Sequence, residues 1–164
     1  MTANLKPAEV NVGDRLPEVQ IPITTSLVTC GALATRDFEK VHHDKDFAQS
    51  SGMPDVYMNI LTTQGLTETY VREWVGPGAR FRKLNIRLGA PNLPGTTMTL
   101  KGEVKAIDNA VIDVEVVGQN DQSGMHVKAL ASIALAHGTE LHEHRSRHLQ
   151  QNPGSLSPAM ASRR

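Results

Sequence analysis

The sequence predicts an α+β domain in which one antiparallel sheet wraps around one long helix. Apolar positions recur every three or four residues between residues 55 and 74, which is the period of a helix. From residue 80 onward they alternate, which is the period of a strand. A single helix with an apolar face needs a large apolar surface to cover, and a curved antiparallel sheet supplies one.

The long helix is predicted from about Asp55 to Trp74, where Gly76-Pro77-Gly78 follows and ends it. Two adjacent stripes carry its predicted core face: Leu66, Tyr70 and Trp74 on one, and Thr63, Thr67 and Val71 on the other. Gly65 lies inside this helix, where it costs about 1 kcal/mol relative to Ala. We therefore expect Gly65 to let another backbone approach closely.

Four strands are predicted between residues 80 and 137, because alternating segments there are joined by short turns rich in Gly, Asn, Asp and Pro. Their order along the chain predicts an antiparallel meander with one solvated face. An earlier strand is expected within residues 16–25, and Pro17 and Pro22 place it at a sheet edge.

The rest of the chain sets the domain limits. Residues 37–49 are charged and predict a turn followed by a short helix that starts near Asp44. We expect residues 1–15 to form a loose polar lead-in, residues 16–137 to form the domain, and residues 138–164 to form a flexible tail.

Composition excludes several classes of protein. The 17 basic residues balance 17 acidic ones, whereas nucleic-acid binders usually carry a basic excess. No apolar run approaches the roughly 20 residues that span a bilayer, and the first residues lack the apolar core of a secretory signal. Cys30 is the single cysteine, so no internal disulfide forms. These features predict a cytoplasmic enzyme or binding module.

The charged segment holds the most informative pair, Asp37 and His42. They are five positions apart, about 140° of rotation on a continuous helix, so they converge only if the residues between them turn. A carboxylate and an imidazole that meet at one water would form a general acid/base pair near neutral pH. The spacing alone also fits a solvated turn in which His42 or Asp44 caps the next helix.

The order of several short motifs favours the catalytic interpretation. The segment resembles MaoC-like, or (R)-specific enoyl-CoA hydratases, whose motif Asp-x-Asn-Pro-x-His precedes an Ala on a short helix. Asp37, His42 and Ala48 match that motif, with Glu39-Lys40 in place of Asn-Pro. The family's Ala-His-Gly-Met at the start of the long helix corresponds to Tyr57-Met58-Asn59-Ile60. The resemblance covers roughly residues 15 to 137.

A narrower actinobacterial subgroup of that family shares more of the pattern, and it includes the small catalytic subunit of the enoyl-CoA hydratase of cholesterol side-chain degradation. Its signatures correspond to Ala34-Thr35-Arg36-Asp37, Val41-His42-His43-Asp44, Asn59-Ile60-Leu61-Thr62 and Gly65-Leu66.

The resemblance implies a hot dog fold and hydration of a 2-enoyl-CoA, and the subgroup suggests a steroid side chain or another bulky acyl group. It implies that Asp37 and His42 hold one water, Asp37 as the main base and His42 as its partner. By position, the backbone N–H of Asn59 is our candidate donor to the thioester carbonyl. Coenzyme A enters as part of the substrate, and no other cofactor and no metal is expected.

Two other functions share the fold: a hot dog acyl-CoA thioesterase, and a non-catalytic acyl-binding subunit. Because hot dog monomers leave a sheet edge open, we expect a homodimer or a heteromer with a second MaoC-like chain. We expect neither nucleic acid nor membrane as a partner.

The remaining polar residues receive structural interpretations. We expect His43 to point into solvent, Cys30 to be a small buried apolar residue, and Tyr70 and Trp74 to belong to the core. Asp44, Asp46 and Asp55 are interpreted as helix-start carboxylates.

Two groups of residues could bind a ligand. A solvated strand face is favoured over coenzyme A phosphate contacts for Arg80, Arg82, Lys83 and Arg87. Composition alone suggests a metal cluster of His142, His144 and His148, and their place in the tail argues against it.

Overall fold

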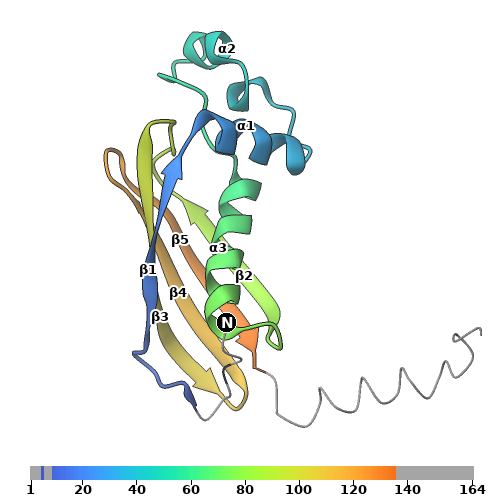
Figure 1. The fold of residues 1–164 in the computed structure, drawn as a ribbon, viewed down its shortest axis with the longest axis vertical. Coiled ribbons are helices and arrows are strands. Elements are labelled where there is room, and N and C mark those ends of the chain that lie inside the picture. Colours follow the sequence, from blue (N-terminus) through green and yellow to red (C-terminus); the bar gives the residue numbers. More distant parts are fainter. Residues whose placement is uncertain (1–4, 6–8, 136–164) are drawn as a thin grey trace, which may run out of the picture.

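A five-stranded antiparallel sheet curves around one long helix in the computed structural model, which describes residue 5 and residues 9–135 (Figure 1). The predicted α+β class is confirmed. The tail 138–164, with its three histidines, lies outside the described residues. In chain order the elements are β1 (Arg15–Ile23), α1 (Thr25–Ala34), a 3-10 turn (Lys40–His42), α2 (Lys45–Ser50), α3 (Ile60–Val75), β2 (Arg80–Leu88), β3 (Thr96–Asp108), β4 (Val111–Asn120) and β5 (Gly124–Ala134).

The strand order is β1-β3-β4-β5-β2, so β1 is an edge strand as predicted. The predicted meander holds for β3, β4 and β5, and it is wrong for β2. That strand pairs with β5, with Leu84 opposite Ala131, while residues 89–95 carry the chain back to β3 near the other edge. Alternation of apolar residues tells which face a strand buries, but it does not tell which strand lies beside it.

The core lies between α3 and the concave face of the sheet. Tyr70, Val71 and Val75 of α3 are buried against inward-facing residues of the strands. A Cβ at Gly102 of β3 would lie 3.2 Å from a ring carbon of Tyr70, so the missing side chain lets the helix approach the sheet. The inward-facing strand residues are Met98, Leu100, Val104, Ile112, Val114, Val116, Val127, Ala129, Ala131 and Ile133.

The long helix starts later than predicted, at Ile60 rather than near Asp55. Asn59 caps it, because its side-chain oxygen accepts the backbone N–H of Thr62 at 2.9 Å. Asp55 is therefore not a helix-start carboxylate; it pairs with Lys45 at 2.8 Å. The helix ends at Gly76, whose φ of 87° is the left-handed conformation that glycine adopts freely.

Gly31 of α1 allows a close approach to α3, and the prediction of this role for Gly65 was wrong. Gly65 is exposed, and a Cβ there would meet nothing within 4 Å. A Cβ at Gly31 would overlap the side chain of Thr62. Helices α1 and α3 therefore touch where α3 begins (Figure 1).

Helix α1 was not predicted from the sequence. Thr24 caps it by accepting the backbone N–H of Leu27 at 3.0 Å, and Val28 and Ala32 form its buried face. Cys30 lies about 200° around the helix from Val28 and is exposed, so the expectation that it is buried was wrong.

The described part of the lead-in is mostly exposed, but it contacts the domain at several points. Val10 is 5% exposed, and Gly13 donates its backbone N–H to the carbonyl of Val104 at 2.9 Å. Residues 1–4 and 6–8 lie outside the described part. Among the described helices, none has the length and apolar character needed to cross a membrane.

Candidate active site

Three segments meet where α3 begins: the end of α1, the 3-10 turn, and the residues just before α3 (Figure 1). They bring Asp37 and His42 together, with Oδ2 of Asp37 3.4 Å from Nε2 of His42. The side chains converge because the chain turns between them. A continuous helix would have separated them.

The chain reverses after α1 through a Schellman motif. The backbone N–H of Asp37 donates to the carbonyl of Ala32 at 2.9 Å, and that of Arg36 donates to Leu33 at 3.0 Å. Arg36 has a φ of 58°, a left-handed conformation that costs a non-glycine residue roughly 1–2 kcal/mol. The reversal directs Asp37 toward the start of α3.

His42 is held in one orientation by the segment that precedes α3. Its Nδ1 lies 2.6 Å from the carbonyl oxygen of Tyr57, and the two rings meet edge to face at 5.1 Å. A carbonyl only accepts, so Nδ1 carries the proton. The other ring nitrogen, Nε2, therefore faces Asp37. The His42 side chain is 8% exposed.

Asp37 is held as a carboxylate by directed hydrogen bonds. Its Oδ2 accepts from the side-chain amide of Asn59 at 2.9 Å, and its Oδ1 accepts from the backbone N–H of Glu39 at 3.3 Å. The Asn59 amide, above all, holds the pKa of Asp37 below its usual value, and the Glu39 N–H and His42 act in the same direction against partial desolvation. Its side chain is 22% exposed and can still be reached.

The side chain of Asn59 is a part of the candidate site that the sequence did not predict. The sequence pointed only to the backbone N–H of Asn59, a role that stays a prediction. The side-chain amide donates to Asp37 and also to Oγ1 of Thr35 at 3.0 Å, while its oxygen caps α3. An Asn directly before a helix is a capping signature, so the cap could have been recognised. The contact with Asp37 could not.

Two further contacts fix the segment that carries Tyr57 and Asn59. The backbone N–H of Tyr57 donates to Val41 at 3.3 Å, and that of Met58 donates to Asn92 at 3.0 Å. Asn92 is fully buried and accepts from the side chain of Asn120 at 2.8 Å. A buried polar network therefore connects the loop after β2 to the site.

The arrangement is suited to bind and orient one water. Oδ2 of Asp37 and Nε2 of His42 lie 3.4 Å apart, so a water molecule beside the pair can hydrogen-bond with both groups. When that water donates a hydrogen to the carboxylate, a lone pair of its oxygen points away from Asp37, which is the orientation a nucleophile needs.

The other predicted residues fall mostly where expected. His43 is exposed, and Asp44 caps α2 by accepting the backbone N–H of Phe47 at 3.0 Å. Asp46 lies in the first turn of α2. Tyr70 is buried, and Trp74 is half-buried against the core. The exposed cations of the edge strand β2 are Arg80, Arg82, Lys83 and Arg87, and their contact with coenzyme A stays a prediction.

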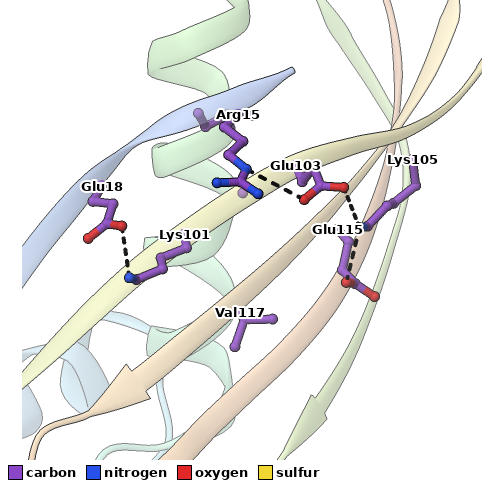
Figure 2. Close-up of a pocket in the computed structure, with 9 residues that line it drawn as sticks. Arg15, Glu18, Lys101, Glu103, Lys105, Glu115 and Val117 are labelled. Carbon is purple, nitrogen blue, oxygen red and sulfur yellow. Dashed lines mark hydrogen bonds and ion pairs between the residues drawn. The ribbon is translucent and has the colours of Figure 1, made fainter. Parts of the chain in front are cut away.

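A pocket lies elsewhere, on the face of the sheet that points away from α3 (Figure 2). Its charged side chains pair with one another, both within a strand and between neighbouring strands. Lys105 contacts Glu103 at 2.6 Å, and Lys101 contacts Glu18 at 2.8 Å. Neither Asp37 nor His42 lines it. Within the described residues, no three His, Cys, Asp or Glu side chains gather closely enough to hold a metal ion.

Comparison with known proteins places the chain in a hydratase family. The chain is 42% identical over 124 residues to the 3-oxo-4,17-pregnadiene-20-carboxyl-CoA hydratase beta subunit of Mycobacterium tuberculosis, a match that covers 76% of this chain and 95% of that subunit. The chain belongs to the MaoC-like hydratase family. No family model matches it.

Solved structures agree with this MaoC-like assignment. A chain of the ChsH1–ChsH2 complex from Mycobacterium tuberculosis is 41% identical, with a TM-score of 0.75 over 77% of this chain and 98% of that chain. The R-hydratase PhaJ1 from Pseudomonas aeruginosa is 19% identical, with a TM-score of 0.74 over 80% of this chain and 86% of that chain. The predicted hot dog fold is confirmed.

Proposed function

We propose that this MaoC-like protein is a 2-enoyl-CoA hydratase, which adds water reversibly across the 2,3 double bond of an acyl-CoA thioester. The observation that carries the proposal is the contact of 3.4 Å between Oδ2 of Asp37 and Nε2 of His42. Its setting in a chain 42% identical to a hydratase subunit supports the same reaction.

Asp37 and His42 activate the attacking water. C3 of the enoyl thioester is electrophilic, and the new C–O bond forms there as a proton leaves the water for Asp37. His42 is the partner and proton relay, held by its Nδ1 hydrogen bond to Tyr57. A proton is then added at C2, so the net change is one hydrogen at C2 and one hydroxyl at C3. General acid/base catalysis of this kind contributes about 10²–10⁴-fold.

Negative charge develops on the thioester oxygen as water adds, and a donor is needed there. The start of α3 supplies backbone N–H groups that lack partners within the helix, together with the positive end of the helix dipole. The backbone N–H of Asn59 is our candidate. Losing one such donor typically costs about 3 kcal/mol in an oxyanion site.

The substrate and the assembly follow from the relatives. The related beta subunit is named for a steroidal carboxyl-CoA, and the related structure is a complex of two different chains. We therefore propose a bulky, steroidal acyl group and a heteromer with a second MaoC-like chain, in the cytoplasm. Coenzyme A enters as part of the substrate, and hydration requires no further cofactor.

The direct test is to incubate the protein with short, long and steroidal 2-enoyl-CoA thioesters, with and without a second MaoC-like chain. Hydration removes the enoyl absorbance and adds 18 mass units (one water) without releasing free thiol. Release of free thiol at the same rate would instead identify a thioesterase. Binding of acyl-CoA without either change, in the presence of the partner, would identify an acyl-binding subunit and would refute the proposal.

A further inference from the structure

Asn59 is buried, and its side chain uses both ends of its amide. It is 2% exposed. The oxygen accepts from the backbone N–H of Thr62, and the nitrogen donates to Oγ1 of Thr35 and to Oδ2 of Asp37. The general MaoC-like motif has glycine at this position and so no side chain to make these contacts, whereas the narrower subgroup signature has Asn there, as this chain does. The contact with Asp37 therefore goes beyond the general motif.

We propose that Asn59 is a positioning residue for hydration, whose side-chain amide holds the Asp37 carboxylate turned toward His42. This inference rests on the proposed function for its catalytic consequence. The contact itself does not depend on it, because the geometry is that of a donor aimed at the carboxylate oxygen that faces Nε2.

Capping of α3 does not explain the choice of Asn. A cap requires an acceptor, and Ser, Thr or Asp would serve as well as Asn. The contacts with Asp37 and Thr35 require a donor as well, and the Asn amide supplies both at this length. The donor half of the side chain is the part that faces the predicted base.

The hydrogen bonds at the two ends of the Asn59 amide also set the distance between the first turn of α3 and Asp37. One end of Asn59 is bound to the first turn of α3, where the thioester oxygen is proposed to lie, and the other end is bound to the base. Thr35, which also accepts from Asn59, donates to the carbonyl of Gly31 at 2.8 Å and so anchors the amide to α1. Loss of the amide would therefore loosen Asp37 relative to the helix.

The test compares Asn59→Ser and Asn59→Asp with the wild-type protein. Both variants keep an acceptor for the cap, and neither keeps the amide donor. We expect the apparent pKa of Asp37, followed by carboxyl-carbon NMR, to rise in both, and to rise further in Asn59→Asp because a second carboxylate faces it. The acidic side of the pH profile of kcat/KM should shift to higher pH together with this pKa. At neutral pH, kcat should fall about 10–100-fold with little change in KM.

Asp44→Ala is the matched control, because it removes the side-chain cap of α2 without touching Asp37. It should lower the melting temperature as a cap loss does, and leave both the Asp37 titration and the acidic side of the pH profile unchanged.

An Asn59→Ser protein that folds and titrates like wild type would overturn the inference and leave Asn59 as a cap. Should Asn59→Ser fail to fold, Asn59→Asp decides by the same titration. Should wild type hydrate no enoyl-CoA, the proposed function fails while the titration still decides whether Asn59 controls Asp37.

Discussion

The start of α3 and the outer face of the sheet (Figure 2) both bring a carboxylate against a basic group, and they differ in what holds the two side chains. On the outer face, the side chains of Glu103 and Lys105 are 36% and 42% exposed and are held by one another. At the start of α3, Asp37 and His42 are 22% and 8% exposed, and neutral hydrogen-bonding groups hold each of them.

The causes of the pKa shifts, rather than their directions, distinguish the two regions. The pKa of Asp37 and that of Glu103 are both lowered, so the direction alone does not distinguish the two regions. The causes differ: the Asn59 amide acts first on Asp37, whereas the Lys105 ammonium acts on Glu103. A contact between opposite charges does not by itself mark a catalytic site. Burial and fixed, directional partners are what prepare a group for chemistry.

Removal of one carboxylate charge from each region should give the largest difference in kcat between matched variants. Asp37→Asn should lower kcat for enoyl-CoA hydration by about 10³–10⁴-fold, because the base is lost while the shape is kept. The matched change Glu103→Gln should leave kcat and KM unchanged. Steady-state rates of both variants at neutral pH check this. Equal activities in the two variants would remove Asp37 from the reaction.

The two adjacent histidines offer a second contrast. His42→Ala should reduce kcat by about 10²–10³-fold, since the buried imidazole that relays the proton is removed. His43→Ala should have no effect, because His43 is exposed. Circular dichroism would check that both variants fold. Retained turnover in His42→Ala would mean that Asp37 acts with another partner.

The packing that supports the site can be tested with two glycines. Gly31→Ala should destabilise the protein by about 1–3 kcal/mol, because its Cβ would overlap Thr62 between α1 and α3. Gly65→Ala, on the exposed face of α3, should stabilise it by about 1 kcal/mol. Urea unfolding of the two variants measures both signs. A stabilising Gly31→Ala would show that α1 is not packed closely on α3.

The smallest expected difference between the two regions is the response of their carboxyl pKa values to salt. In 1 M salt the lowered pKa of Glu103 should rise toward its ordinary value, because an exposed ammonium holds it. The pKa of Asp37 should move much less, because an uncharged amide holds it. Each carboxylate stabilises the fold above its unfolded pKa, and this contribution is lost as pH falls through the folded pKa. Salt should therefore weaken this pH dependence for Glu103 but not for Asp37, and carboxyl NMR titrations at two salt concentrations measure the shifts.

The sequence predicted much of the fold because most elements carry a local pattern. The alternation in β3, β4 and β5 and the stripes of α3 were recognised from spacing. Helix α1 was missed because only Val28 and Ala32 form its buried face, which is too narrow to show a helical period. The exposure of Cys30 and the packing at Gly31 were missed with it.

The candidate site was predicted in part. Asp37 and His42 were identified from residue type and motif, and the turn that joins them had to be inferred. The side-chain role of Asn59 was not predicted, because a capping residue does not reveal what its second polar atom faces. Thr35 and the carbonyl of Tyr57 left no signal, since any residue supplies a carbonyl.

By itself the sequence determined which segments form the strands and the long helix, where α3 ends, and which acid and which imidazole stand close in the chain. These are local properties, decided by side-chain period, caps and backbone preferences over a few residues. Only the tertiary structure decided that β2 pairs with β5 and that Asn59 reaches Asp37, 22 positions away. Such contacts depend on how whole elements pack against one another, because burial of the shared core sets their positions and no local pattern encodes them.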